Sequence, residues 1–308
     1  MDYKIYSIIV NYNSAVWIKK TIESIKNSSY PLKTIVVDNN STDKSLDWIE
    51  NNYQEIYIVK SKRNLGFGKA NNIGIKYALD QGADYVFLQN QDLYLEVNCI
   101  HNLLKVAINN QDFALYSPLH LNGNGSSLDY WFSIYSSPPK CKGYVSELAL
   151  GKSLKPIYET SMVNAAAWLI PKRTLKRIGG FHPSFFHYGE DSNYCDRLNY
   201  FGMKIGIVPN AKAYHDRAQR ERSKFETDEI EILERNLIKN FSFPNRPKAK
   251  FFLSLKYLVA IFKAFRNLHK VEICRNLNFL YKIIRFDNKS IEEVNLEFAE
   301  NSYCYINK

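Results

Sequence analysis

The stretch that decides the fold is TIVVDNNSTD, residues 34–43, in which a short β-branched run changes abruptly into polar residues. The apolar run is typical of a buried strand, and Asp38 closes it. The polar residues favour a turn, in which Ser41 or Thr42 can cap a helix that begins near Ser45. The stretch therefore predicts a buried strand, a polar loop and a helix, in that order.

The same alternation of strand and helix continues on both sides of this stretch. Short β-branched or aromatic runs predict further strands over residues 5–10, 56–59 and 85–88. Apolar residues at helical spacing predict helices over residues 14–27, 45–51 and 69–80. Alternation at this spacing is typical of βαβ units, so we expect an α/β protein with a mostly parallel sheet.

The middle of the chain is less regular. Residues 117–156 are rich in Gly, Ser, Pro and Asn, and we expect long loops with short strands there, which would shape an acceptor site. The elements predicted after them are a strand over 165–170, a helix from Pro171, a helix over 191–201, a strand over 205–208 and a turn at 209–210.

Polar side chains stand where three of the predicted strands end, namely Asn11, Asp38 and Asp92. Ligands of open α/β sheets bind beyond the carboxyl ends of the strands. Asp38 is placed to bind a nucleobase or ribose, and a capped turn is the alternative. Asp92, beside Asn90 and Gln91, can hold Mg²⁺ or Mn²⁺ against a diphosphate, and a surface turn is the alternative.

Three further segments are candidates for chemistry. The stretch NLGFGKAN, residues 64–71, resembles a dinucleotide fingerprint only weakly, because Asn71 replaces the third glycine; it is either a plain loop or a helix start with free N–H groups for a phosphate. Glu190 and Asp191 stand at a predicted helix start, as capping acids or as a general base. His215 is a structural histidine or a metal ligand.

Composition limits the classes that remain. The chain has 308 residues, 45% of them hydrophobic, and a net charge of +10, which indicates an anionic partner: nucleic acid, a lipid surface or a phosphorylated substrate. Its five cysteines are widely spaced without a Cys-x-x-Cys pair, so we expect neither a zinc site nor a disulfide framework. With no signal-peptide or spanning pattern, we expect a cytoplasmic protein, peripheral on the inner face of the cell membrane.

The order of the motifs is more specific than any one of them. The stretches IIVNYN (8–13), VVDNNSTD (36–43), NLGF (64–67), NQD (90–92) and GED (189–191) together resemble the family 2 glycosyltransferases with the GT-A fold, especially the rhamnosyltransferase-like branch. The resemblance covers about residues 4–216. It implies a GT-A nucleotide-diphospho-sugar transferase fold, which is Rossmann-like, with a C-terminal helical extension.

The resemblance also implies roles for individual residues. Asp92 would bind the metal and the diphosphate with His215, the metal being Mg²⁺ or Mn²⁺, although Asn90 replaces the first acid of the family motif. Asp191 would be the catalytic base, with Glu190 as the less favoured choice, and Asn193 replaces a later acid of the family. The nucleotide-sugar pocket would be formed by Asn11, Asn13, Asp38, Asn40, Asn64, Gly66, Asn71, Asn90 and Gln91.

The activity implied is inverting transfer of a sugar from a nucleotide-diphosphate donor, dTDP-rhamnose or a UDP-hexose, to a glycan or lipid-diphosphate-linked acceptor in bacterial surface polysaccharide synthesis. The alternative is a degenerate GT-A module that binds a nucleotide sugar or glycan without transfer. We expect a catalytic domain over residues 1–216, with a nucleotide-binding half over about 1–116 and an acceptor half over about 117–216.

Residues 217–308 are expected to form a basic, amphipathic helical region. Between Arg246 and Arg285, ten Lys and Arg residues face a single acid, Glu272, and aromatic residues recur among them at helical spacing. Such a helix either lies on an anionic membrane surface or caps the catalytic domain. We expect no nucleic-acid partner, because no recognised nucleic-acid motif is present.

Overall fold

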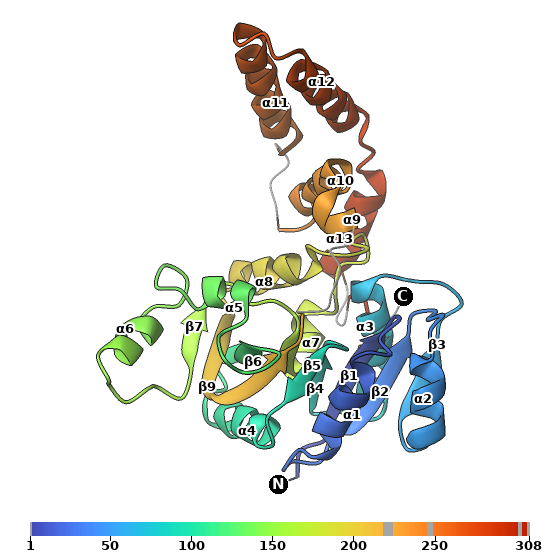
Figure 1. The fold of residues 1–308 in the computed structure, drawn as a ribbon, viewed down its shortest axis with the longest axis vertical. Coiled ribbons are helices and arrows are strands. Elements are labelled where there is room, and N and C mark those ends of the chain that lie inside the picture. The colour runs from blue at the N-terminus through green and yellow to red at the C-terminus, as the bar shows by residue number, and fades with distance from the viewer. Residues whose placement is uncertain (1, 218–223, 245–248, 301–303, 307–308) are drawn as a thin grey trace.

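The computed structural model describes residues 2–217, 224–244, 249–300 and 304–306. Nine strands form one sheet in the order β3-β2-β1-β4-β8-β6-β9-β5, with β7 paired to β9 (Figure 1). The strands are β1 (Ile5–Asn11), β2 (Lys33–Asp38), β3 (Tyr57–Lys60), β4 (Tyr85–Gln89), β5 (Leu93–Leu95), β6 (Phe113–Asn122), β7 (Tyr158–Thr160), β8 (Ala167–Pro171) and β9 (Lys204–His215).

The two halves of the sheet differ in strand direction. Strands β3, β2, β1 and β4 are all parallel, and β6 is parallel to β9. Strand β8 runs antiparallel between β4 and β6, and β5 and β7 are antiparallel to β9. The predicted α/β class is confirmed, and the parallel half of the sheet is the part that the strand–helix alternation predicts.

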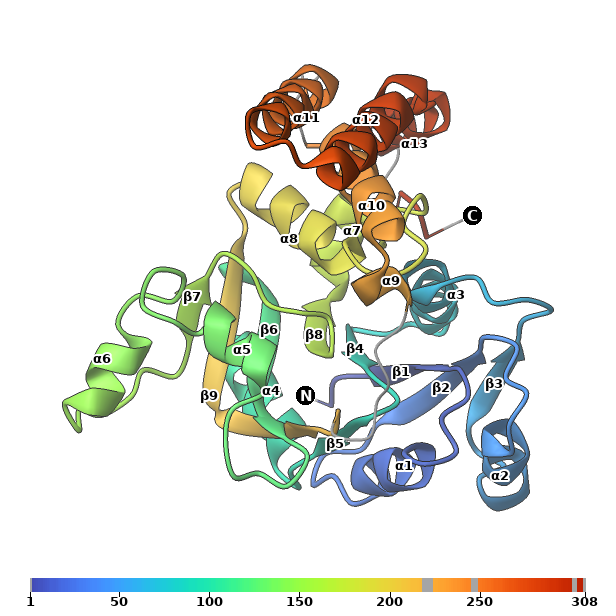
Figure 2. The same ribbon diagram turned by 45° about the horizontal axis from the view of Figure 1, so that its top comes forward.

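Helices cover both faces of this sheet (Figure 2). Alternate residues of the strands face opposite ways, so Ile8 joins one core with α3 and Ile9 joins the other with α1. Helices α3, α7 and α8 contribute to the first core, and α1, α2 and α4 to the second. Their bounds are α1 (Ile18–Lys26), α2 (Ser45–Asn52), α3 (Phe67–Asp80), α4 (Cys99–Asn109), α7 (Lys172–Ile178) and α8 (Glu190–Tyr200).

The middle of the chain corrects several predictions. Residues 113–122 form the long strand β6, and the expected loops also contain the helices α5 (Tyr130–Tyr135) and α6 (Tyr144–Ala149). Strand β9 continues through the predicted turn at 209–210, because a bulge opposite Pro118 and Leu119 absorbs the irregular residues. Helix α4 was not predicted, and α1 begins at Ile18 because residues 14–17 form a turn on the Ser14 carbonyl.

The C-terminal region contains α9 (Lys224–Thr227), α10 (Glu229–Phe241), α11 (Ala249–Arg266), α12 (Lys270–Arg285) and α13 (Lys289–Glu300). The basic tail expected over 246–285 forms two helices, α11 and α12, which pack as a hairpin; Arg246 and Lys248 lie outside the described residues. Among the helices described, none is both long and apolar enough to cross a bilayer.

Part of this region packs on the sheet domain, and part stands away from it. Lys239 of α10 donates to Ser192 of α8 at 2.5 Å, and the carbonyl of Tyr305 accepts from the Asn72 side chain at 2.9 Å. The α11–α12 hairpin projects beyond α10 and α13 at the end of the molecule farthest from the sheet (Figure 1). The region therefore includes both a packed segment, as the capping alternative requires, and a projecting one.

Candidate active site

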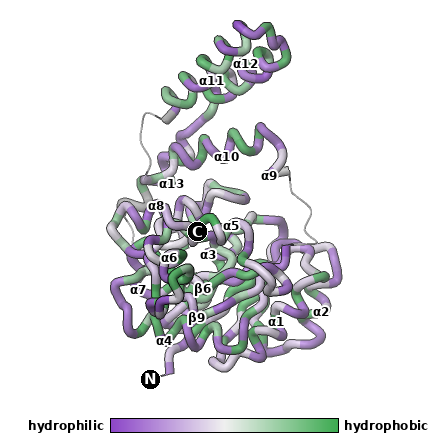
Figure 3. Tube along the Cα trace, turned by 60° about the vertical axis from the view of Figure 1, so that its left-hand side comes forward, coloured by the Kyte–Doolittle hydropathy of each residue, from purple (hydrophilic) through white to green (hydrophobic). Residues whose placement is uncertain are grey.

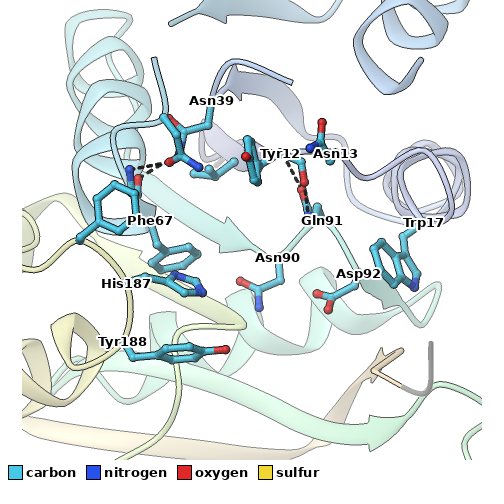
Figure 4. Close-up of a pocket in the computed structure, with 14 residues that line it drawn as sticks. Tyr12, Asn13, Trp17, Asn39, Phe67, Asn90, Gln91, Asp92, His187 and Tyr188 are labelled. Carbon is cyan, nitrogen blue, oxygen red and sulfur yellow. Dashed lines mark hydrogen bonds between the residues drawn. The ribbon is translucent and has the colours of Figure 1, made fainter. Parts of the chain in front are cut away.

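A cavity of about 360 Å³ opens at the carboxyl ends of the parallel strands, which is where the sequence places a binding site (Figure 4). One wall comes from the ends of β1, β2 and β4, and the facing wall comes from the loop before α8. The residues that line it are Val10, Tyr12, Asn13, Trp17, Asn39, Asn64, Gly66, Phe67, Asn90, Gln91, Asp92, Phe186, His187 and Tyr188.

Six of the predicted site residues lie in this lining: Asn13, Asn64, Gly66, Asn90, Gln91 and Asp92. Two others lie beneath it. Asn11 is fully buried, and its side-chain amide donates to the Asp38 carboxylate at 2.8 Å and to two serine hydroxyls. Asp38 also accepts from the Ser41 N–H at 3.1 Å. These bonds fix the ends of β1 and β2 together, and base binding by Asp38 stays a prediction.

Asn40 and Asn71 occupy different positions from the lining residues. Asn40 is exposed after β2, in left-handed backbone with φ 68°. Asn71 is buried in α3, where its side-chain amide donates to the Phe67 carbonyl one turn earlier at 3.0 Å. Asn71 therefore stabilises the first turn of α3, because its amide group bonds to the backbone of its own helix.

Asn39, which the sequence analysis passed over between Asp38 and Asn40, connects two loops of the cavity. Its side-chain amide donates to Asn64 at 2.8 Å, and its side-chain oxygen accepts from the Leu65 N–H at 2.8 Å. The Gly66 N–H donates to Asn64, and the Phe67 N–H donates to the Phe186 carbonyl. The prediction of free N–H groups at this helix start is thus wrong for Leu65, Gly66 and Phe67.

Gly66 is needed for the close approach of the two walls. Its φ is 82°, and a Cβ atom built there would lie 2.0 Å from the Phe186 carbonyl oxygen. Only glycine fits without displacing the loop that carries His187 and Tyr188.

We therefore expect Gly66→Ala to lower the free energy of unfolding by about 3 kcal/mol, because backbone must move as well as adopt a strained φ. Gly202→Ala is the matched control, since Gly202 has φ 66° and no atom within 4 Å of the added Cβ; its expected loss is about 1 kcal/mol. Urea unfolding measures both. Equal losses would show that the close approach contributes nothing.

The segment after β4 meets the end of β9 beside Asp92 at the edge of the cavity, and His215 lines a neighbouring cavity together with Asp129 and Arg217. Strand β5 follows Asp92 directly and pairs with β9, so that Leu93 lies opposite His215. Asp92 Oδ1 is 3.3 Å from His215 Nε2, and the Asn90 amide nitrogen is 3.5 Å from the same atom. The structure thus brings together the two predicted metal ligands, which are 123 positions apart in the sequence.

Asp92 and His215 are suited to hold a divalent cation whose other ligands come from water and a bound diphosphate. In the described part of the chain, no three His, Cys, Asp or Glu side chains gather as a metal site. The Asn90 side-chain oxygen, however, is buried and has no hydrogen-bond partner within the described structure. Mg²⁺ and Mn²⁺ are commonly held by one or two protein groups, water and phosphate oxygens. Asp92, His215 and the Asn90 oxygen are therefore enough to form the protein's share of such a site.

Asp129 lies on the other side of the His215 ring from Asp92 and was not predicted. Its Oδ1 caps α5 by accepting from the Phe132 N–H, and its Oδ2 lies 3.5 Å from His215 Nδ1 and 3.6 Å from Arg217 Nε. A carboxylate behind a histidine fixes the orientation of the ring. The sequence signal was that of a capping Asp before an aromatic helix, which does not reveal the contact with His215.

The acidic pair Glu190 and Asp191 begins α8, after Gly189 in the left-handed conformation. Glu190 is buried, its Oε2 has no hydrogen-bond partner within the described residues, and burial together with the nearby charge of Asp191 raises the pKa of Glu190 to about 8. Burial also raises the pKa of Asp191, but the Ser192 N–H and the charges of Lys239 and Arg217 oppose the rise. Asp191 is therefore the acid that ionises more readily near neutral pH.

Glu190 should make stability depend on pH. Because its pKa is raised above the ordinary 4.5, the folded state holds this proton more tightly, and stability is lost as pH rises from about 4.5 to 8. We expect Glu190→Gln to remove that loss, on the order of a few kcal/mol, in urea unfolding across this range. Glu159→Gln, at an exposed glutamate of β7, is the control. Parallel stability curves for the wild type and Glu190→Gln would contradict the assignment.

Asn193, at the position where the resemblance implies an acid, connects α8 to neighbouring segments. It is fully buried, its amide donates to the Phe243 carbonyl at 2.8 Å, and its oxygen accepts from Arg197 at 3.1 Å. Arg197 in turn donates to the carbonyls of Ile178 and Gly180 at 2.6 Å. Asn193 therefore holds α8 to the C-terminal region.

Part of the chain matches a known protein family. Residues 7–141 match the family described as Glycosyl transferase family 2. The chain is 27% identical over 223 residues to the low-salt glycan biosynthesis hexosyltransferase Agl10 of Haloferax volcanii, covering 71% of this chain and 69% of Agl10. It is 23% identical to the dTDP-rhamnosyl transferase RfbF of Shigella flexneri, covering 70% of each, and 27% identical to the rhamnosyltransferase WbbL of Escherichia coli K12, covering 72% of this chain and 86% of WbbL.

The fold has solved relatives as well. The structure of GalNAc-T7 with UDP, GalNAc and Mn²⁺ superposes with a TM-score of 0.63 at 13% identity, covering 99% of this chain. The present chain spans 56% of that one. The chain has a GT-A fold. Over residues 7–141 the chain matches glycosyl transferase family 2, and it is similar to proteins named rhamnosyltransferases.

Proposed function

We propose that this chain is an inverting glycosyltransferase that moves a sugar from dTDP-rhamnose or a UDP-hexose to a glycan or lipid-diphosphate-linked acceptor in bacterial surface polysaccharide synthesis. The observation that carries the proposal is the 3.3 Å pairing of Asp92, which lines the carboxyl-end cavity, with His215. The names of RfbF and Agl10 support the two donor classes. We assign catalysis to residues 1–216 and leave residues 217–308 as a helical region.

The donor diphosphate would lie beside Asp92 and His215. Asp92 and His215 would hold Mg²⁺ or Mn²⁺, which would neutralise the charge that develops on the departing nucleotide diphosphate. Asp129, behind His215, keeps the ring oriented toward Asp92. The Mn²⁺ of the GalNAc-T7 structure supports the choice of a divalent ion. Asn13, Asn64 and Gln91 offer polar contacts to the nucleotide along the wall.

Asp191 would take the proton from the acceptor hydroxyl as that oxygen attacks the anomeric carbon. Arg217 supports this placement, since its Nε lies 3.2 Å from His215 and its charge also lowers the pKa of Asp191. A single displacement needs no nucleophilic carboxylate on the opposite side of the sugar. Because one displacement inverts the anomeric carbon, the product would have inverted configuration.

The working location proposed is the cytoplasmic side of the cell membrane. All five cysteines are free, and all but Cys274 are buried, which is consistent with a reducing compartment.

A transfer assay separates this proposal from the degenerate module. Donors labelled in the sugar are incubated with the chain, Mn²⁺ and polyprenyl-diphosphate-linked sugars from bacterial membranes. We expect label in the lipid fraction from one donor, with inverted anomeric configuration by NMR. If that donor binds tightly and its label never leaves the nucleotide, the chain is a binding module.

A further inference from the structure

Helix α11 carries an apolar stripe that no other described element covers. Residues spaced four, three, four and three apart lie on one face of a helix. On α11 these residues are Phe251, Leu255, Leu258, Phe262 and Phe265, with exposed fractions of 65%, 46%, 50%, 68% and 62%. A continuous exposed patch of this kind marks an interaction surface.

The opposite face of α11 already has a partner. Tyr257 packs edge-on against Phe279 of α12, with ring centroids 5.3 Å apart, and Leu253 packs against the same small core. Ala264 is buried on this side as well. Packing of the hairpin therefore explains the inner face of α11, and it leaves the five-residue stripe unexplained.

The charges beside the stripe have one sign. Lys256 and Lys263 are seven positions apart on one side of the helix, beyond the exposed Phe252 and Val259, and Arg266 follows at the end of the helix. No Asp or Glu occurs between Ala249 and Val271. An apolar stripe of Phe and Leu with a basic flank is the arrangement of helices that lie in the interface of an anionic bilayer.

The position of the hairpin agrees with such a contact. Figure 3 shows α11 and α12 at the far end of the molecule, separated from the sheet by α10 and α13, with hydrophobic and hydrophilic residues interleaved. A binding partner at that end can contact α11 without contacting the active-site cavity.

We propose that the outer face of α11 docks on an anionic phospholipid surface, with the Phe251–Phe265 stripe in the interface and the lysines at the headgroups. The proposal deepens the proposed function, because it places the catalytic domain beside a lipid-linked acceptor. A second copy of the chain would cover the stripe but would leave the charges of Lys256 and Lys263 without a counter-charge from α11 of the partner, which has no Asp or Glu. Anionic headgroups neutralise those charges, worth about 1 kcal/mol, or roughly fivefold in binding, for each lysine.

Vesicle co-sedimentation of the full chain tests this. Vesicles of phosphatidylcholine with phosphatidylglycerol should bind the wild type, and vesicles of phosphatidylcholine alone should bind it at least about tenfold more weakly. The triple variant Phe251→Ser, Phe262→Ser, Phe265→Ser should lose about 100-fold in partition coefficient. The matched control is Leu148→Ser with Leu150→Ser, two exposed leucines at α6, which should bind as the wild type does.

The charge is tested separately with Lys256→Glu and Lys263→Glu, which should weaken binding about tenfold or more, and with Lys105→Glu and Lys176→Glu on the catalytic domain as controls. The proposal is overturned if the triple variant still binds, if neutral vesicles bind equally well, or if the stripe variants instead abolish a dimer in ultracentrifugation. Release of nucleoside diphosphate from a soluble donor should be unchanged in the triple variant. A chain that binds vesicles and cleaves no donor would contradict the catalytic proposal alone.

Discussion

Asp191→Asn is expected to lower sugar transfer by about 10²–10⁴-fold while nucleotide-sugar binding stays nearly unchanged. The substitution keeps the size of the side chain and its bond from the Ser192 N–H, and removes the group that would accept the acceptor proton. Binding should survive because Asp191 lies outside the residues that line the nucleotide cavity. Initial rates with the labelled donor, and calorimetry with the same donor, measure the two quantities.

Asp196→Asn is the matched control, since Asp196 lies on the same helix and its carboxylate faces Lys239 at 3.8 Å. It should transfer at close to the wild-type rate. Full activity of Asp191→Asn would remove Asp191 from the role of base. If Glu190→Gln alone lost transfer, the base would be Glu190, despite the raised pKa that favours its protonated form at neutral pH.

Asp92→Asn is expected to have the second large effect, a loss of about 10³-fold in metal-dependent turnover, because it removes the carboxylate that would hold the cation. Nucleotide binding should also lose its response to Mn²⁺ in calorimetry. Asp129→Asn, which acts through the orientation of His215, should lose less, about 10–100-fold, and excess Mn²⁺ should restore part of it.

His101→Ala, at an exposed histidine of α4, is the control for nonspecific metal binding. Metal-dependent binding that persists unchanged in Asp92→Asn would mean that the cation, if any, is held elsewhere.

Some of this site could be predicted from sequence because it depends on local pattern. The run before Asp38 is a buried strand by composition, and a parallel sheet places its carboxyl end at the same edge as that of the strand before Asn90, with β1 between the two. Asp92 and His215 were paired only through the resemblance to a family. Their contact depends on β5, a strand of three residues that no periodicity reveals.

Other parts of the site depend on contacts between distant segments. Asn39 is one of several polar residues after β2, and only its bonds to Asn64 and Leu65 distinguish it. The wall formed by Phe186, His187 and Tyr188 meets the Gly66 loop across 120 positions of sequence, through the bond from the Phe67 N–H to the Phe186 carbonyl. A glycine in a loop indicates conformational freedom, but it does not show which other segment of the chain packs against it.

The long strand β6 was missed for a similar reason. Its Ser117 and Pro118 are typical of loops, yet both are accommodated between β8 and β9, where a bulge follows Pro118. Tertiary pairing outweighs local propensity at such positions.

The measurement that tests the central claim most directly is release of free nucleoside diphosphate from a panel of dTDP- and UDP-sugars, with Mn²⁺ or Mg²⁺ and with EDTA. The pairing of Asp92 with His215 predicts slow release from one donor, abolished by EDTA and restored by added metal. Absence of release from every donor, together with no metal-dependent binding of any of them in calorimetry, would contradict the catalytic account and leave a module that only binds.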